Sequence, residues 1–312
     1  MSRRAIRKAA LLPVELGLTA AIVAVNGARP LILTTRGEDE DGLAALPSGP
    51  FDPVAHRTLE IGLRAWVAEQ TGAPIGYVEQ LYTFGDRGRH AQAGDVAPHN
   101  VSVGYLALTR VAPRAEAASG FRDWHEFFPW EDWRDGRPAL LDAQILPSLQ
   151  DWAAGASGRL ERVGLLFGEG AARDEERTLE RYELLYDAGL VEEAWRDGRA
   201  AARPAAALGL AMRHDHRRIL ATAMGRLRAK LKYRPVVFEL MAPSFTLTAL
   251  QRTVEAISGK LIHKQNFRRL VESTDLVEPT GDTAHQTGGR PAALYRFRRD
   301  VVAERPAPGL RV

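Results

Sequence analysis

The sequence contains no cysteine, only five lysines and no long apolar run. The absence of cysteine excludes disulfides, thiolate metal sites and cysteine nucleophiles, and it fits a reducing compartment. No run approaches the roughly 18 apolar residues that a membrane-spanning helix needs. The composition is otherwise ordinary for a globular protein: 45% of the 312 residues are hydrophobic and 26% are charged. That length corresponds to about two domains of roughly 150 residues each.

The N-terminus has features of a secretory signal peptide, because four cationic residues within positions 3–8 precede an apolar stretch. However, Pro13 and Glu15 interrupt that stretch. It then continues through Asn26-Gly27 into a second apolar segment, a pattern typical of a β-hairpin. We therefore favour a cytoplasmic protein over a secreted one.

Charge is distributed unevenly along the chain. Residues 1–112 hold 11 Lys+Arg and 11 Asp+Glu, residues 113–212 hold 12 and 19, and residues 213–312 hold 19 and 9, which gives net charges of 0, −7 and +10. Four of the five lysines also lie in the last third. A basic block of this size is typical of a nucleic-acid-binding domain.

Residues 1–112 carry four strand-like segments, with one helical segment between them at residues 54–72. Its apolar residues Leu59, Leu63, Trp66 and Val67 share one helical face. Strands on both sides of a helix predict an α/β sandwich.

Residues 113–212 are acidic, and we predict that they are largely helical. Five aromatic residues between Trp124 and Trp133 are expected to pack in a core or to anchor this region against the first domain or a second subunit. Residues 171–198 read as one long charged helix, and residues 199–209 as a linker.

The last third contains the DNA-binding candidate. We predict a basic amphipathic helix at residues 214–233, for which the alternative of a metal site at His214-Asp215-His216 is less favoured because no third ligand is evident nearby. Thr246 can cap a following helix that Ser258-Gly259 ends, and a second helix starts near His263 with Phe267, Leu270 and Val271 facing inward. This order predicts a helix-turn-helix.

Two strand-like segments follow, separated by a Gly-rich loop that ends in Arg290-Pro291. They extend the helix-turn-helix into a winged helix over residues 213–302, and residues 303–312 are predicted to be a disordered tail. In a major groove Lys264 and Arg268 can read guanine, and Gln265 or Asn266 adenine. The other candidate DNA contacts are Lys230, Lys232, Thr246, Thr248, Arg252, Lys260, His263, Arg269 and Arg290.

The helical segment that ends at Gly72 resembles the signature helix of Nudix hydrolases, whose clustered carboxylates hold Mg²⁺ beside a pyrophosphate. With Gly72 aligned to the final glycine of that motif, Glu69 and Gln70 fall on its paired glutamates, Ala65-Trp66 on its Arg-Glu pair, and Arg57 on its first glutamate. One carboxylate remains, so we predict neither a metal site nor catalytic residues.

A Nudix-like domain followed by a winged helix resembles the NrtR-type and NadQ-type regulators of bacterial NAD metabolism, most specifically over residues 226–299. The resemblance implies an α+β protein: a Nudix-like domain at residues 1–112, an insert at 113–212 and a winged helix at 213–302. It also implies a homodimeric, nucleoid-associated repressor of NAD-synthesis genes that binds operator DNA. The implied effector is an adenine nucleotide: ADP-ribose, NAD or ATP.

Five residues are candidates for holding that nucleotide. Arg36, Arg87 and Arg89 offer cations to phosphates, and Tyr82 or Phe84 offers a ring to adenine. Two alternatives stay open from the sequence: a Mg²⁺-dependent pyrophosphatase acting on ADP-ribose or a dinucleotide, and a non-specific nucleic-acid binder.

Overall fold

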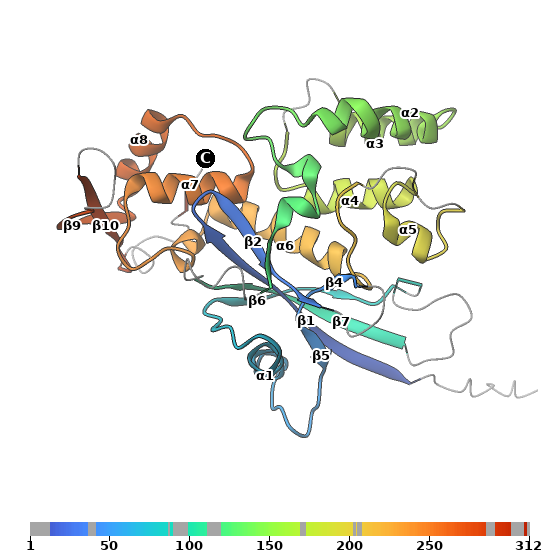
Figure 1. Ribbon diagram of the computed structural model, residues 1–312, viewed down its shortest axis with the longest axis horizontal. Coiled ribbons are helices and arrows are strands. Elements are labelled where there is room, and N and C mark those ends of the chain that lie inside the picture. Colours follow the sequence, from blue (N-terminus) through green and yellow to red (C-terminus); the bar gives the residue numbers. More distant parts are fainter. Residues whose placement is uncertain are drawn as a thin grey trace, which may run out of the picture.

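The computed structural model describes residues 13–36, 42–86, 88–89, 99–110, 120–168, 173–201, 204, 208–284, 291–300 and 309–310. Two of the predicted site residues, Arg87 and Arg290, lie outside the described residues. The fold is α+β, as predicted, with a sheet in the middle, a helical insert on one side and a winged helix at one end (Figure 1).

The central sheet has six strands: β1 (Val14–Asn26), β2 (Arg29–Leu33), β5 (Ser48–Pro50), β6 (Val78–Phe84), β7 (His99–Leu108) and β8 (Phe121–Asp123). Its order is β6-β7-β1-β2-β8, with β5 also paired to β1, and the long β1–β7 pair is parallel. Two short strands, β3 (Thr35–Arg36) and β4 (Ala44–Ala45), form a separate antiparallel pair.

The predicted hairpin is confirmed. β1 and β2 pair antiparallel around the turn after Asn26, where Gly27 has a φ of 62°. Side chains of β1 alternate between two cores: Leu18 and Ile22 pack in one, and Ala21 and Val23 in the other. The sheet is therefore covered on both faces, as in a sandwich.

Helix α1 (Leu59–Thr71) covers one face with the buried residues Leu63 and Val67. It begins five residues later than predicted, because the side chain of Thr58 accepts the N–H of Ile61 and caps the first turn. Gly72 ends it in the left-handed conformation, with a φ of 62°.

Helix α6 (His216–Leu231) lies against the opposite face of the sheet (Figure 1). The prediction of a helix here is confirmed, but two of its arginines do not lie on an exposed polar face. Arg217 and Arg228 are each only 1% exposed, because their guanidinium groups pair with buried carboxylates of the insert. The domain boundary at residue 213 stays a prediction.

In its described residues the acidic insert forms three 3₁₀ or π turns and four helices, and it packs on α6 and on the winged helix. The aromatic residues Trp124, Phe127, Phe128 and Trp130 are almost fully buried, which supports core packing. The predicted single helix at residues 171–198 is wrong: Gly189, with a φ of 73°, separates two helices. The elements are η2 (Trp124–Glu126), η3 (Pro129–Glu131), η4 (Leu141–Ile145), α2 (Leu146–Ala153), α3 (Ser157–Phe167), α4 (Thr178–Asp187) and α5 (Glu192–Arg196).

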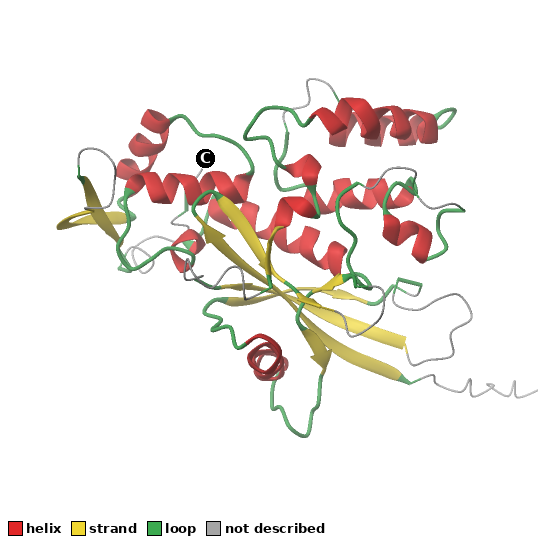
Figure 2. Cartoon of the chain, viewed as in Figure 1, coloured by secondary structure: helices red, strands yellow, loops and turns green. Residues whose placement is uncertain are grey.

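The winged helix is built as predicted (Figure 2). After the 3₁₀ turn η5 (Val236–Glu239), α7 (Leu247–Ser258) and α8 (Lys264–Thr274) form the helix-turn-helix, and β9 (Val277–Ala284) and β10 (Ala292–Phe297) pair antiparallel as the wing. Gly259 makes the turn with a φ of 68°.

Part of the predicted disordered tail is ordered. Leu310 is 1% exposed, and its N–H donates to the carbonyl of Leu231 at 2.7 Å. This contact places residues 309–310 against the end of α6. Across the described residues, no helix is both long and apolar enough to cross a membrane.

Candidate nucleic-acid interface and effector cavity

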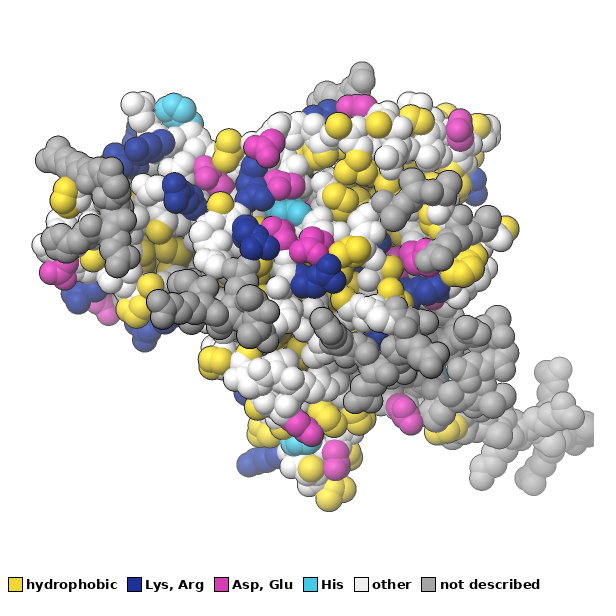
Figure 3. All heavy atoms as spheres, viewed as in Figure 1, with side chains coloured by type: hydrophobic (Ala, Val, Ile, Leu, Met, Phe, Trp, Pro, Cys, Tyr) yellow, Lys and Arg dark blue, Asp and Glu magenta, His cyan; other side chains and the backbone are white. Residues whose placement is uncertain are grey.

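Helix α8 is strongly amphipathic. Phe267 and Val271 are at most 1% exposed and fix the inner face against the domain. The side chains on the remaining faces are exposed: Lys264, Gln265, Asn266, Arg268, Arg269 and Glu272. Lys and Arg side chains gather over this end of the molecule (Figure 3). The helix thus exposes Lys, Arg, Gln and Asn side chains, the types that can pair with guanine and adenine in a major groove.

The turn between α7 and α8 is fixed by hydrogen bonds. The Thr246 hydroxyl accepts the N–H of Ala249 at 3.1 Å and caps α7, as predicted. Glu255 accepts the backbone N–H of Ile262 at 2.9 Å, and Gln251 donates to the carbonyl of the same residue at 2.8 Å. These bonds set the angle at which α8 leaves the turn.

The other predicted DNA contacts fall into two groups. Thr248 and Arg252 on α7, and His263 at the N-cap of α8, are exposed beside the recognition face. The lysines are paired: Lys230 with Glu79 at 3.0 Å, Lys232 with Glu176 at 2.6 Å, and Lys260 with Glu175 at 3.5 Å. DNA would have to compete with a carboxylate for each of these lysines, so their roles stay predictions with less geometric support.

The Nudix-like helix α1 uses its key positions to hold a strand. The indole N–H of Trp66 donates to the carbonyl of Pro50 at 2.8 Å. The amide of Gln70 donates to the carbonyl of Ser48 at 2.7 Å and accepts its N–H at 3.1 Å. Glycine is required at Gly49, because a Cβ there would lie 2.3 Å from the Trp66 ring. α1 and β5 are therefore tied together where hydrolases bind metal.

This donor set does not fit the Mg²⁺ ions that the Nudix fold implies. Hard cations need several oxygen ligands, usually carboxylates. Of the aligned positions only Glu69 is acidic, and it is exposed. In the part of the chain that the structure describes, no group of three or more His, Asp or Glu residues is arranged to hold a metal ion.

A cavity of about 210 Å³ lies next to this helix–strand contact. Its walls come from the first half of β1, from β5, from the start of β7 and from the start of α6. The polar lining consists of Glu15, Thr19, Ser48, Asn100, Ser102, His214 and His216. None of these residues was among the sequence-based effector candidates; only their common position at one end of the sheet reveals them.

Apart from the Glu15 carboxylate, the polar lining of the cavity consists of hydroxyl, amide and imidazole groups. The amide oxygen of Asn100 is buried and has no hydrogen-bond partner in the described part of the chain. The hydroxyls of Thr19 and Ser102 lie 2.7 Å apart, and Nδ1 of His216 accepts the N–H of Leu46 at 2.9 Å. Hydroxyl and amide side chains in the lining suit a ligand with hydrogen-bonding groups, such as an adenine or a ribose.

The four described residues among the predicted effector candidates lie outside this cavity. Arg89 is buried, donates to Glu183 at 2.7 Å and stacks 3.9 Å from the ring centre of Tyr186. Phe84 is 1% exposed, and Arg36 and Tyr82 are not in the cavity lining. The assignment of these residues to the effector site stays a prediction. The geometry favours the cavity as the candidate nucleotide site instead.

Known proteins resemble this chain both in its winged helix and in its overall fold. The family model described as the NrtR DNA-binding winged helix domain matches residues 237–297. A curated relative, the ADPR responsive transcriptional repressor NtrR of Acinetobacter baylyi, is 43% identical over 91 residues, 29% of this chain. The match spans only 36% of that relative's length.

Two solved structures share the fold over nearly the whole chain. The crystal structure of Shewanella oneidensis NrtR complexed with a 27mer DNA has a TM-score of 0.55 and 22% identity, covering 92% of this chain and 95% of that chain. A MutT/nudix family protein from Enterococcus faecalis has a TM-score of 0.50 and 16% identity, covering 96% and 90%. The similarity therefore includes both the sandwich and the winged helix.

Proposed function

We propose that this chain is an NrtR-type DNA-binding repressor controlled by an adenine nucleotide, because residues 237–297 match the NrtR winged helix domain and the fold resembles that of Shewanella oneidensis NrtR. One observation carries the proposal: α8 buries Phe267 and Val271 and leaves its cationic and amide side chains exposed. The target genes would be those of NAD synthesis or salvage.

ADP-ribose is the first candidate for the effector, since the curated relative is described as ADPR responsive. The cavity between β1, β5 and α6 would hold its adenosine part, because the lining is polar but largely uncharged. NAD and ATP share that adenosine and are the other candidates. In a homodimer, ligand binding would alter the spacing of two α8 helices, which must match half-sites about 34 Å apart.

The repressor would not hydrolyse its effector. A dinuclear Mg²⁺ site needs several carboxylates to neutralise and orient the ions. Glu69 is alone at the aligned positions, and Trp66 and Gln70 bond to β5 instead. Glu69 and the Nudix-like fold are the features that remain in favour of the pyrophosphatase alternative.

The test is a selection of bound sequences from a pool of random duplexes, followed by titration of the winning sequence with ADP-ribose, NAD and ATP. We expect one sequence preferred by about 10³-fold or more over random DNA, and an affinity that changes with one nucleotide. Equal binding to all sequences would identify a non-specific binder. Release of AMP and ribose phosphate from ADP-ribose in the presence of Mg²⁺ would favour the enzyme.

The position of the effector is tested by Asn100→Leu. This change removes the amide that Asn100 contributes to the cavity lining, and we expect ADP-ribose affinity to fall by about 1–2 kcal/mol, or roughly tenfold. Isothermal titration calorimetry measures it, with thermal unfolding as the check on folding. Tyr82→Ala is the parallel variant, because Tyr82 is exposed on β6 outside the cavity. A loss with Tyr82→Ala alone would return the site to the sequence-based candidates.

A further inference from the structure

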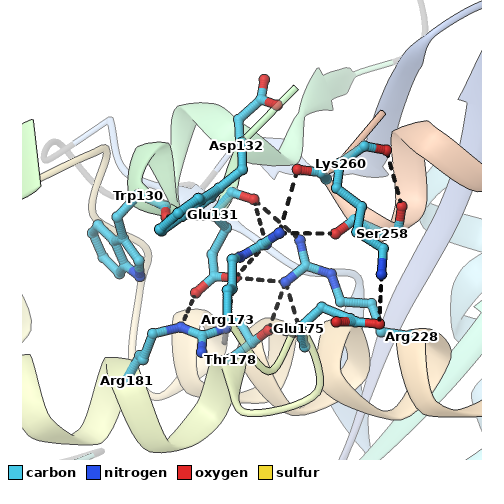
Figure 4. Close-up of polar contacts among 12 residues, drawn as sticks. Trp130, Glu131, Asp132, Arg173, Glu175, Thr178, Arg181, Arg228, Ser258 and Lys260 are labelled. Atoms are coloured by element: carbon cyan, nitrogen blue, oxygen red, sulfur yellow. Dashed lines mark hydrogen bonds and ion pairs between the residues drawn. The ribbon is translucent and has the colours of Figure 1, made fainter. Parts of the chain in front are cut away.

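A buried charge cluster joins the insert to the helix-turn-helix. At its centre lies Glu131 of η3, which is 0% exposed. Its carboxylate accepts from Arg181 at 2.6 and 2.9 Å, from Arg228 at 2.5 Å and from Arg173 at 3.2 Å (Figure 4). Here these four residues are called the Glu131 cluster.

The cluster contains more positive than negative charge. Burial raises the pKa of the Glu131 carboxyl, but attraction by Arg181 and Arg228 outweighs burial and holds that pKa well below its ordinary range. Burial also lowers the pKa of Arg228 to about 10, against the opposing attraction of Glu131. One carboxylate facing three guanidiniums leaves donors to spare for other acceptors.

Those spare donors bind the end of α7. Arg173 donates to the carbonyls of Ser258 and Gly259, each at 3.3 Å, and Arg228 donates to the carbonyl of Ile257 at 2.8 Å. The last carbonyls of a helix have no partner within it and favour nearby cations. Arg173 of the insert and Arg228 of α6 thus together supply the C-terminal cap of the first helix of the helix-turn-helix.

The turn between α7 and α8 packs closely against the insert. The backbone N–H of Trp133 donates to the carbonyl of Gly259 at 2.8 Å. A Cβ at Gly259 would lie 2.4 Å from the carbonyl oxygen of Glu131. The turn that sets the direction of α8 is therefore seated on the insert as well as on its own domain.

The same cluster is connected to the effector cavity by one helix. His216, at the first turn of α6, lines the cavity. Arg228 lies twelve residues further along the same unbroken helix, a distance of about 18 Å at 1.5 Å per residue. A displacement of the start of α6 by a ligand would be carried along a rigid element to the cap of α7.

We propose that Arg173, held by Glu131, is a positioning residue for the recognition helix, and that the insert serves to pass the state of the effector cavity from α6 to the helix-turn-helix. The transmission from cavity to helix-turn-helix rests on the proposed function, because it requires the effector and the DNA. The positioning of the turn by Arg173 does not depend on that function. A cluster that only stabilised the fold would give the same stability loss without any change specific to the turn.

The first experiment is hydrogen exchange on the full chain carrying Arg173→Ala. We expect residues 258–262 to exchange about tenfold faster or more, while α1 and β7 keep their protection. Arg177→Ala is the matched control, since Arg177 lies four residues away and pairs with Asp174 and Glu180 without touching α7. Equal exchange of the turn in both variants would overturn the proposal, whatever the protein binds.

The second experiment measures coupling with the selected duplex and ADP-ribose. We expect Arg173→Ala to bind ADP-ribose within about threefold of wild type and to lose most of the nucleotide-dependent change in DNA affinity, which in coupled systems is typically 5- to 150-fold. Arg173→Lys, which keeps a cation near the carbonyls, should recover part of that change. A full response in Arg173→Ala would contradict the transmission role. A wild type without any nucleotide response would instead reject the proposed effector, and the exchange result would still decide the seating of the turn.

Discussion

Replacing Glu131 with glutamine is expected to lower the free energy of unfolding by about 3–5 kcal/mol, the range for removing one partner of a buried ion pair. Glutamine has nearly the same shape but leaves Arg173, Arg181 and Arg228 as buried cations without a counter-charge. Urea unfolding at neutral pH measures the difference.

Glu60→Gln is the matched control, because Glu60 pairs with Arg64 on the surface of α1 with half of its side chain exposed. We expect its effect to stay below about 1 kcal/mol. If both variants lost the same small amount, Glu131 would not be the counter-ion that the geometry indicates.

The effect of Glu131 should depend on pH with a defined sign. The folded-state pKa of Glu131 lies below its ordinary value of 4.5, so its ionised form is stabilised by folding. The difference between wild type and Glu131→Gln is therefore complete above that ordinary value and declines as the pH falls below it toward the folded-state pKa. A difference that grew on acidification would contradict this assignment.

Replacing Arg268 with alanine is expected to cost about 1–3 kcal/mol of binding to the selected duplex and to relax the preference at one base pair. Arg268 is exposed on α8, and a bidentate guanidinium is the usual reader of guanine in the major groove. Competition binding against duplexes mutated at each position measures both quantities.

Arg269→Ala is the comparison variant, with the same charge change one position along the helix. We expect it to weaken all sequences about equally and to lower the dependence on salt, as loss of a phosphate contact does. The roles of the two arginines are reversed if Arg269→Ala relaxes the base preference instead. Helical geometry permits that outcome. Arg269 lies about 200° around the helix from the buried Phe267 and Arg268 about 100°, so neither side chain lies on the buried face.

Much of the winged helix followed from local sequence. The cap at Thr246, the turn at Gly259 and the inward positions Phe267 and Val271 depend on neighbours a few residues away, and the structure confirms each of them. The same holds for the hairpin after Asn26. Side-chain periodicity and turn chemistry are short-range properties, so the chain itself reveals them.

Helix α6 shows where local patterns mislead. Arg228 fits the polar face of an amphipathic helix, and that pattern predicts exposure to solvent. In the structure it is buried against Glu131, 97 positions earlier in the chain. No periodicity reports such a partner, because burial of a charge depends on which distant carboxylate the fold delivers to it.

The residues that line the cavity were likewise not evident from local sequence patterns. Sequence reasoning looked for cations and aromatic rings in a Gly-rich loop and placed the effector at Arg89 and Phe84, which the fold buries. The cavity instead combines Thr19, Ser48, Asn100 and His216, residues that carry no motif. They meet because β1 pairs with both β5 and β7 and α6 packs across their ends.

The sequence by itself determined the helix-turn-helix and its wing, and it showed that only one of the metal-binding carboxylates of the Nudix motif is present. Both are properties of residue identity at short, regular spacing. Only the tertiary structure decided where the polar cavity lies and what holds the helix-turn-helix in place. Those features depend on hydrogen bonds and ion pairs between residues far apart in the chain, whose strength comes from the exclusion of water that folding alone produces.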